Sequence, residues 1–374
     1  MILDWRVYPL PLAEPLRISR SVMARRDAVA VRLTHDGVTG HGEVVTSTYQ
    51  RLDLGRIDEA LTALRPRVTG HADPEALRAD LPALAAALPE VPGVLGALDA
   101  AVHDLVGQRA GVPVWRLVDA PARATAATAY TIGLVPPADA AAAARRLVAA
   151  GFTVLKLKAG ADDDVARITA VRAAAPAARL LLDPNGAWTP ERTVRVLDAV
   201  AACAVDAVEQ PVPPGDPDAL AWIGARVTVP VVADEDVATV ADVHRLAGAV
   251  AGVNVKLAKC GGITAAHRLI VAATGYGMDV MLGCLVASTL GIAPALHLAG
   301  HARWVDLDGH LLLADDPWTG IGGADGTLRT PDGPGLGVRP AQAAHPAQAA
   351  HPAQAAHPAQ AAHPAQAAHP AVAR

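Results

Sequence analysis

The chain has 374 residues, of which 52% are hydrophobic, and a formal net charge of −5. This length allows one large α/β domain with a smaller second domain, and the charge pattern offers no basic stripe that would favour nucleic acid or an anionic membrane. No run of eighteen apolar residues is free of charge or proline, which argues against a membrane-spanning helix.

Two features concern the cellular compartment. The N-terminus has no basic stretch followed by an apolar segment, so the sequence does not predict a secretory signal. The three cysteines, Cys203, Cys260 and Cys284, are odd in number and far apart, which argues against a disulfide framework or a CxxC metal site. The sequence therefore predicts a reducing, cytoplasmic location.

Residues 1–120 are expected to form an α+β capping domain. Alternation over residues 27–34 predicts a strand, and His35-Asp36-Gly37 predicts a turn. Helices are expected between residues 61 and 107. A later segment, at about residues 315–338, is expected to complete this domain.

From residue 125 onward, short β-branched and apolar runs alternate with alanine-rich helical stretches. The eight runs are 129–133, 154–158, 180–183, 207–210, 231–234, 252–256, 280–285 and 304–308. Eight parallel strands that are mostly joined by helices are what a closed barrel requires. No clear helix follows the last run, so residues 121–314 predict an α/β fold of the modified TIM-barrel type, (β/α)7β.

Polar residues mark the ends of five of these runs at a nearly constant spacing. Asp183 follows Lys158 by 25 residues, Glu209 follows by another 26, Asp234 by another 25 and Lys256 by another 22. A strand, a helix and two loops take about that many residues. These side chains are therefore expected at the C-terminal ends of parallel strands, which is where barrel enzymes place their active sites.

Asp183, Glu209 and Asp234 would present three carboxylates to one point. Such a cluster repels itself unless a cation neutralises it. Oxygen ligands without a nearby Cys or His favour Mg²⁺, at one ion per subunit. The alternative is that each carboxylate separately caps a helix or pairs with an arginine. Three carboxylates in register favour the metal.

Lys156 and Lys158 lie two residues apart on one strand, so their side chains leave from the same face. Two ammonium groups that close are expected to lower a lysine pKa, which would equip one of them as a base. Lys256 is expected on the opposite wall of the site. A lone lysine on a strand is more often a snorkelling surface residue, but lysines on apolar strands on both sides of the carboxylates favour catalysis.

These motifs together resemble the enolase superfamily, specifically its muconate-lactonizing subgroup. The resemblance covers nearly all of residues 1–338 and is carried by Lys156-Leu-Lys158, Asp183-Pro-Asn185, Glu209-Gln-Pro211, Asp234-Glu235 and Asn254-Val-Lys256. It implies Mg²⁺ ligation by the three carboxylates and an acid/base pair formed by Lys158 and Lys256. In such enzymes one lysine removes a proton α to a carboxylate, while Mg²⁺ and a residue such as Lys156 neutralise the enolate.

Asp306 and Asp308 end the eighth run and are expected to point the same way, as an anionic pocket for an α-ammonium group. Asp-x-Asp at this position is similar to the dipeptide epimerases, where it holds the free N-terminus of the substrate. Thr131, at the end of the first run, is also assigned to the substrate site. The alternative for either aspartate is that it caps a turn at Gly309.

Loops near residues 17–26 and 44–51 are expected to set substrate specificity. In family members that prefer an acidic second residue, an arginine in the first loop binds the side-chain carboxylate. An ungapped comparison puts Met23 at that position, although Arg25 and Arg26 lie close enough for a shifted loop to restore the charge. The departure favours a neutral or hydrophobic second residue.

Arg20 and Tyr49 are further predicted substrate contacts in these two loops. Ala287 stands where many relatives carry Glu, but that position varies among epimerases and does not indicate loss of activity.

The sequence thus predicts a Mg²⁺-dependent dipeptide epimerase that acts on a small-molecule substrate. Other enzymes that use the same two lysines stay open, namely N-acylamino-acid racemase, o-succinylbenzoate synthase and muconate cycloisomerase. A catalytically silent metal-binding homologue also stays open. The identity of the second residue and the oligomeric state, a homo-oligomer included, are not predicted.

Residues 339–374 are dominated by five copies of the hexapeptide Ala-Gln-Ala-Ala-His-Pro. A proline at every sixth position prevents a continuous helix, and nothing in the repeat forms a core. The regularly spaced histidines could bind a metal, but the composition favours a disordered tail.

Overall fold

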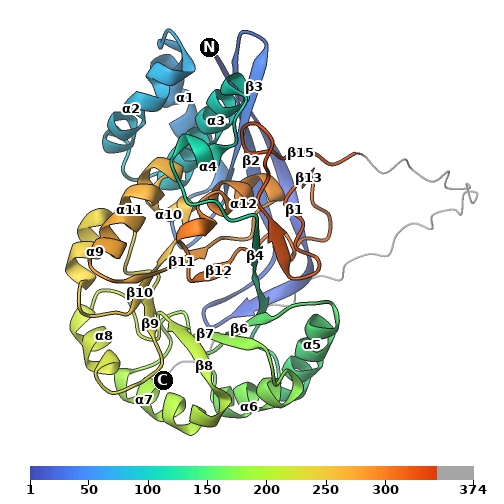
Figure 1. Ribbon diagram of the computed structural model, residues 1–374, viewed down its shortest axis with the longest axis vertical. Helices are drawn as coiled ribbons and strands as arrows, with labels where there is room; N and C mark the ends of the chain where they lie inside the picture. Colours follow the sequence, from blue (N-terminus) through green and yellow to red (C-terminus); the bar gives the residue numbers. More distant parts are fainter. Residues whose placement is uncertain (343–374) are drawn as a thin grey trace, which may run out of the picture. The chain divides into compact units, whose positions relative to one another are not determined.

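The chain begins with a three-stranded antiparallel sheet followed by helices (Figure 1). The structure, a computed structural model, describes residues 1–342. The strands pair in the order β1-β2-β3 and span Ile2–Ile18, Ser21–His35 and Val38–Val45. The helices α1 to α4 span Leu54–Thr69, Pro74–Ala87, Pro92–Ala110 and Val114–Leu117.

The predicted turn between β2 and β3 is confirmed. Asp36 and Gly37 have φ values of 49° and 77°, the left-handed pair that a two-residue hairpin requires. The predicted helices are also present, although α1 starts earlier than expected, at Leu54, where the Asp53 side chain accepts a hydrogen bond from Arg56 N at 2.9 Å.

The eight predicted barrel strands are all present, each within about two residues of its expected bounds. The strands β5 to β12 span Ala129–Ile132, Val154–Lys158, Arg179–Asp183, Val205–Glu209, Val231–Ala233, Gly252–Val255, Asp279–Gly283 and Trp304–Asp306. Neighbours in sequence are neighbours in the sheet, and every pairing is parallel. The barrel prediction is therefore confirmed.

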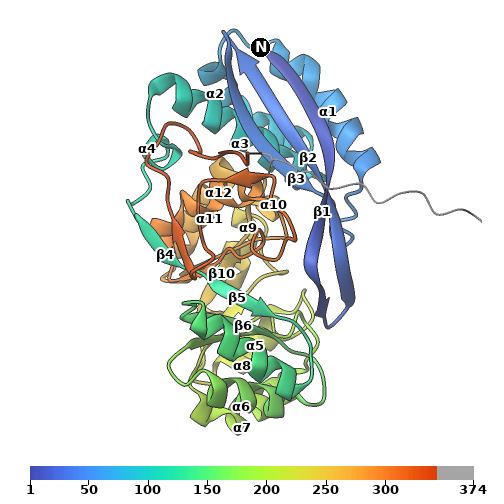
Figure 2. The same cartoon turned by 90° about the vertical axis from the view of Figure 1, so that its right-hand side faces the viewer.

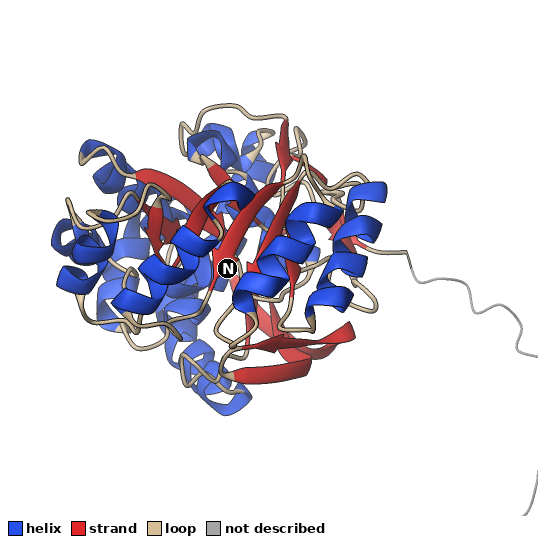
Figure 3. Ribbon diagram, turned by 90° about the horizontal axis from the view of Figure 1, so that it is seen from below, coloured by secondary structure: helices blue, strands red, loops and turns tan. Residues whose placement is uncertain are grey.

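Helices connect consecutive strands and cover the outside of the barrel (Figure 3). They are α5 Pro137–Ala149, α6 Asp164–Ala174, α7 Pro190–Ala199, α8 Pro217–Gly224, α9 Val240–Leu246, α10 Leu257–Cys260, α11 Ile263–Gly275 and α12 Thr289–Leu296, with 3₁₀ turns at Ala201–Cys203 and Ala299–His301. Within the described chain, no α-helix follows β12. This confirms the (β/α)7β topology.

Several helices begin where a capping side chain precedes a proline. Asp73, Thr189 and Asp216 each accept a hydrogen bond from the backbone N–H three residues on, and the next residue is proline in each case. Proline suits the first helical position because that residue's N–H has no partner within the helix, while the capping oxygen satisfies a later one. Local sequence thus fixes where these helices start.

The barrel interior is layered. Its floor contains one apolar side chain from each of seven strands: Ala129, Val154, Leu181, Ala207, Val232, Met281 and Trp304. The remaining strand contributes Gly252, where an added Cβ would lie 3.2 Å from the Trp304 ring. Since side chains alternate along a strand, the inward residues one step beyond this floor form a polar layer at the C-terminal ends.

The first and last strands, β5 and β12, are joined by side-chain hydrogen bonds. Thr128 Oγ1 accepts from Leu307 N at 3.0 Å, and an Asp308 carboxylate oxygen accepts from Thr131 N at 2.7 Å. Polar side chains therefore occupy the place of a backbone ladder where the barrel closes.

The chain after the barrel returns to the capping helices. Strand β14, Thr327–Arg329, pairs with β4, Thr125–Ala127, and Leu336 N donates to the Asp104 carboxylate at 2.8 Å. The expected domain boundaries near residues 120 and 315 stay predictions, because residues 1–341 form one continuous body of contacts. No helix among the described residues has the length and hydropathy needed to cross a membrane.

Two residues at the start of the predicted tail lie in a strand, and the tail boundary stays a prediction. Strand β15, Arg339–Pro340, pairs with β13, Trp318–Thr319. These residues are held by backbone hydrogen bonds, which composition alone did not indicate. Most of the repeat, and with it the predicted disorder, lies outside the described residues.

Candidate active site

A cavity of about 550 Å³ lies at the C-terminal ends of the barrel strands. The β1–β2 hairpin extends along the barrel and supplies one wall (Figure 2). Among the predicted site residues, those that line the cavity are Arg20, Met23, Tyr49, Thr131, Lys156, Lys158, Asp234, Lys256, Asp306 and Asp308. Asp183 and Glu209 are buried and do not line it.

Backbone and side-chain amide groups form hydrogen bonds with the three predicted metal ligands. Asp183 Oδ1 accepts from Asn185 N at 2.9 Å, and Glu209 Oε1 accepts from the Asn254 amide at 2.8 Å. Asp234 is held through its backbone, since its N–H donates to the Gln210 side chain at 2.9 Å. The Asp183 and Glu209 carboxylates thus have hydrogen-bond donors besides the lysines, whereas the Asp234 carboxylate contacts Lys256 and Lys259.

Lys156 lies at the centre of the polar layer and is only 2% exposed. Its Nζ lies 3.0 Å from Asp183 Oδ2, 2.5 Å from Glu209 Oε2 and 2.7 Å from Asp306 Oδ2. One ammonium thus contacts carboxylates from three different strands.

Lys158 and Lys256 lie on opposite sides of the carboxylate cluster. Lys158 Nζ lies 2.6 Å from Asp183 Oδ2, and Lys256 Nζ lies 2.6 Å from Asp234 Oδ2 and 3.6 Å from Glu209 Oε1. Gly283 makes room for the second lysine, because an added Cβ there would lie 2.8 Å from Lys256 Cε. Their strands, β6 and β10, are separated by β7, β8 and β9.

The lowered lysine pKa that was expected for one member of the Lys156–Lys158 pair is not found at Lys156. Burial acts to lower the Lys156 pKa, but the negative charges of Asp183, Asp306 and Glu209 outweigh it and hold that pKa well above its usual value. Burial also acts to lower the Lys256 pKa, but the negative charges around it, chiefly that of Asp234, outweigh burial and raise that pKa. Carboxylate contacts, which sequence spacing did not predict, decide both pKa values.

The pKa values of the three carboxylates shift in opposite directions. Burial, followed by the charge of Asp183, raises the pKa of Glu209 to about 7. Burial would also raise the Asp183 pKa, but the Lys156 and Lys158 ammonium groups outweigh it and lower that pKa. Burial would raise the pKa of Asp234 as well, but the Lys256 ammonium group outweighs it and lowers that pKa.

The predicted metal ligands are separated by the lysines. Within residues 1–342, no three carboxylate, histidine or cysteine groups lie close enough together to hold a metal ion as they stand. The donor set nevertheless suits Mg²⁺, because Asp183, Glu209 and Asp234 offer only oxygen ligands from successive strands. Glu209 Oε2 is buried without a hydrogen bond and already lies against a cation, Lys156.

In the predicted ammonium pocket, one oxygen of each aspartate accepts a hydrogen bond, and the second oxygen of Asp306 accepts none. Asp306 Oδ2 accepts from Lys156 and Asp308 Oδ2 accepts from Thr131 N, so neither side chain caps the turn at Gly309. Asp306 Oδ1 is buried without a hydrogen-bond partner. Burial, followed by the charge of Asp306, raises the pKa of Asp308 to about 6. The pocket therefore contains a carboxylate oxygen that is free to accept a hydrogen bond from a cation.

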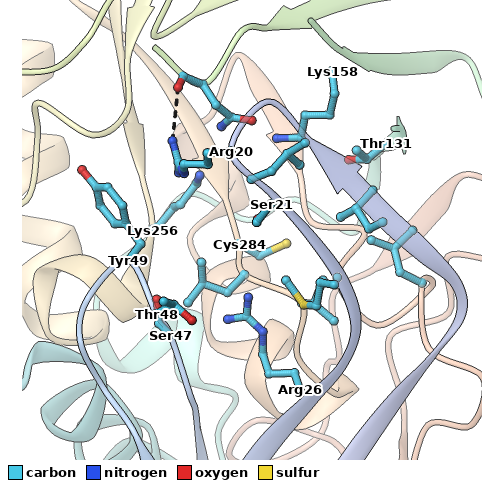
Figure 4. A pocket seen from close by; sticks show the side chains of 18 of the residues that line it. Arg20, Ser21, Arg26, Ser47, Thr48, Tyr49, Thr131, Lys158, Lys256 and Cys284 are labelled. Carbon is cyan, nitrogen blue, oxygen red and sulfur yellow. Dashed lines mark hydrogen bonds between the residues drawn. The ribbon is translucent and has the colours of Figure 1, made fainter. Parts of the chain in front are cut away.

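Arg20 crosses from the hairpin to the barrel rim. Its guanidinium donates to the Asn185 carbonyl at 3.2 Å, pairs with Glu235 at 2.7 Å and lies 4.8 Å from the centre of the Tyr49 ring (Figure 4). Met23 lines the same cavity. The three predicted specificity residues are thus brought to one cavity, and their roles as substrate contacts stay predictions.

Sequence reasoning missed Lys259, Gln210 and Asn254 as members of the site. Lys259 Nζ lies 2.5 Å from Asp234 Oδ1. A compositional signal existed: the chain contains four lysines, at 156, 158, 256 and 259, and the described structure brings all four against these carboxylates. Asn254 could also have been found, because it shares a strand face with Lys256.

Comparisons with known proteins agree with this geometry. Residues 4–118 match the mandelate racemase/muconate lactonizing enzyme N-terminal domain, and residues 139–344 match the enolase C-terminal domain-like family. A hydrophobic dipeptide epimerase from Roseobacter litoralis is 33% identical over 329 residues, covering 86% of this chain and 94% of that protein. An L-Ala-D/L-Glu epimerase from Bacteroides thetaiotaomicron is 30% identical, covering 88% and 86% respectively.

A solved structure extends the similarity to the fold. The dipeptide epimerase from Enterococcus faecalis, complexed with Mg and the dipeptide L-Leu-L-Tyr, superposes with a TM-score of 0.85 at 29% identity, covering 90% of this chain and 98% of that one. With the domain matches and the curated relatives, this shows that the chain belongs to the enolase superfamily, in its mandelate racemase/muconate lactonizing enzyme family.

Proposed function

We propose that this chain is a Mg²⁺-dependent dipeptide epimerase that inverts the α-carbon of the C-terminal residue of a dipeptide. The observation that carries the proposal is the placement of Lys158 and Lys256 on opposite sides of one buried carboxylate cluster at the cavity. Two bases on opposite faces allow a proton to leave one face and return on the other.

Asp183, Glu209 and Asp234 are the residues that would hold the metal. These residues would hold an Mg²⁺ ion, which would supply positive charge opposite their carboxylates and the charge that develops on the substrate. Lys158 and Lys256 currently pair with two of the same carboxylates. A lysine whose carboxylate partner is neutralised loses the interaction that favours its protonated form, which lets it accept a proton from the substrate.

Lys156 has a different role in this proposal. It is buried between three carboxylates and keeps its proton. A fixed ammonium at the base of the site stabilises the negative charge that develops when the α-proton leaves.

Asp306 and Asp308 would bind the α-ammonium of the substrate. The unpartnered Asp306 Oδ1 lacks a donor that an ammonium group supplies. We further propose a neutral or hydrophobic second residue, since the nearby Arg20 is already neutralised by Glu235. The three free cysteines support a reducing, cytoplasmic compartment.

The direct test is proton exchange. Dipeptides of varied composition, incubated with the enzyme and Mg²⁺ in D₂O, should gain one α-deuterium at the second residue, detected as a mass increase. A panel in which no dipeptide gains deuterium would overturn the proposal.

An N-acylamino-acid racemase is the second candidate, because Asp306 Oδ2 is already neutralised by Lys156 and an acyl substrate would bring no ammonium. Asp306→Asn and Asp308→Asn separate the two candidates. A dipeptide epimerase should lose turnover of dipeptides in both variants. Unchanged turnover would mean that no ammonium is bound there, and would favour the acyl substrate.

A further inference from the structure

Arg26 carries a guanidinium into the cavity wall without a carboxylate partner among residues 1–342. An arginine has five N–H donors, yet the hydrogen bond that the structure gives this one is from Nη1 to the Thr46 carbonyl at 2.9 Å. Figure 4 shows the side chain pointing into the pocket, toward Cys284. Burial lowers the pKa of Arg26 to about 10, as expected for a half-buried charge without an anion beside it.

Two arginines near Arg26 in the hairpin are neutralised within the chain. Arg20 pairs with Glu235 at 2.7 Å, and Arg25 pairs with Asp27 at 2.6 Å. Arg26 is half-buried, and a charge that is partly withdrawn from water and left unpaired is costly. Its presence at the wall of the substrate cavity therefore points to an anion that arrives with the ligand.

The position of Arg26 indicates which part of the ligand carries this anion. Arg20, at the end of the hairpin, reaches Asn185 and Glu235, on the side of the proposed metal ligands. Arg26 lies further from the hairpin end, paired in register with Leu10.

Cys284 connects Arg26 to the ammonium pocket. It follows β11, directly beside β12, and burial together with the charges of Asp308 and Asp306 raises the pKa of its thiol. Arg26 lines the same cavity as Cys284 and the two aspartates, and its side chain points toward Cys284 (Figure 4). A dipeptide whose α-ammonium lies at Asp306 and Asp308 has its first residue here, whereas its carboxylate lies across the cavity.

We propose that Arg26 binds a carboxylate on the side chain of the first residue, so that the preferred dipeptides begin with Glu or Asp. This rests on the proposed function and adds to it a substrate class. The first residue would be read by opposite charges, its ammonium by the two aspartates and its side chain by Arg26. The cavity lining near the hairpin also includes apolar side chains, namely Leu16, Val22, Met23, Leu285, Val286 and Leu312.

The test compares two isosteric substrates. Rates of diastereomer interconversion, as kcat/KM, are measured for L-Glu-L-Leu, L-Gln-L-Leu and L-Ala-L-Leu with Mg²⁺ present. Loss of a charge-assisted hydrogen bond predicts that the wild type prefers Glu over Gln at the first position by roughly 10- to 100-fold. In Arg26→Met this ratio should approach one, and in Arg26→Glu a preference for L-Lys-L-Leu should appear.

Arg32→Ala is the matched control, because Arg32 lies on the same strand in an exposed pair with Asp4, 2.6 Å away and outside the cavity. It should keep the wild-type ratio. A ratio near one in the wild type, together with turnover of L-Ala-L-Leu, overturns the inference and leaves the epimerase function standing. The ratio measured for the wild type tests the inference even if the Arg26→Met variant does not fold.

Two further outcomes locate the error if the inference fails. Failure of the wild type to exchange any dipeptide overturns the proposed function itself, and the inference with it. Faster racemisation of N-succinyl-L-leucine than epimerisation of L-Glu-L-Leu, lost in Arg26→Met, would mean that the carboxylate belongs to an acyl group, which overturns the assignment to a first residue.

Discussion

All four lysines of the chain contact the buried carboxylates of the candidate site. Lys158 and Lys256 were predictable because they stand at strand ends in step with the barrel repeat, and Lys156 because it shares a strand face with Lys158. Lys259 was not, because it follows the strand in the short helix α10, where the strand period no longer applies. The ion pairs could not be predicted from the sequence either, because they join strands that are far apart in the chain.

Replacement of Lys158 or Lys256 tests the two-base assignment. Lys158→Ala and Lys256→Ala should each lower epimerisation roughly 10²- to 10⁴-fold, the usual contribution of one acid/base group. Each variant should still exchange the α-proton of one diastereomer only, which ¹H NMR in D₂O detects.

The arginine variants are the matched controls for charge. Lys158→Arg and Lys256→Arg keep a cation beside Asp183 and Asp234 but cannot supply a neutral base. They should be about as inactive as the alanine variants, while circular dichroism shows an intact fold. Wild-type rates in either arginine variant would mean that the lysine serves only as a counter-ion.

At the scale of elements, the barrel strands were predictable because each is a short apolar run that ends in a polar residue. The contacts that join elements were not. The junction of β5 and β12 depends on Thr128 and Asp308 side chains that replace a ladder, and β15 depends on a partner about twenty residues away.

His297, at the C-terminal end of α12, also joins elements that are distant in the sequence. Its Nδ1 accepts from Trp115 N at 3.3 Å, which leaves Nε2–H to donate to the Leu336 carbonyl at 3.2 Å. Burial lowers the pKa of this histidine to about 4. The neutral ring thus joins the barrel to α4 and to the closing segment.

Stability should depend on pH through His297. The unfolded chain binds a proton near pH 6.5 and the folded chain only near pH 4, so the free energy of unfolding falls as pH decreases through this interval, by about 3 kcal/mol for this group. In urea unfolding, His297→Gln should lose less stability than the wild type between pH 7 and pH 4. The exposed control His244→Gln should follow the wild type, and a parallel curve for His297→Gln would contradict the assignment.

On the scale of the whole molecule, the site is completed only when the capping hairpin meets the barrel. The sequence predicted both parts and assigned Arg20 and Met23 to the site, but their approach depends on contacts such as Arg20 with Glu235. The unpaired state of Arg26 is likewise a property of the assembled chain, because any nearby carboxylate in three dimensions would have removed it.

Mg²⁺ binding should stabilise the whole chain if the three carboxylates hold the ion. A ligand at about 100 times its Kd adds roughly 2.7 kcal/mol to the free energy of unfolding, which corresponds to a rise in Tm of several degrees. Thermal melts with Mg²⁺ and with EDTA measure this directly. Asp234→Asn should reduce the rise, whereas Asp279→Asn, in an exposed pair with Arg303, should not.

Reversible inversion at one carbon can be measured by starting from each diastereomer of one dipeptide. The L,L- and L,D-forms of a dipeptide with a hydrophobic second residue are incubated separately with the enzyme and Mg²⁺ and followed by chiral chromatography. An enzyme that inverts this carbon reversibly should bring both reactions to the same mixture of diastereomers. Two unchanged starting materials, under conditions in which an N-acyl amino acid is racemised, would contradict it.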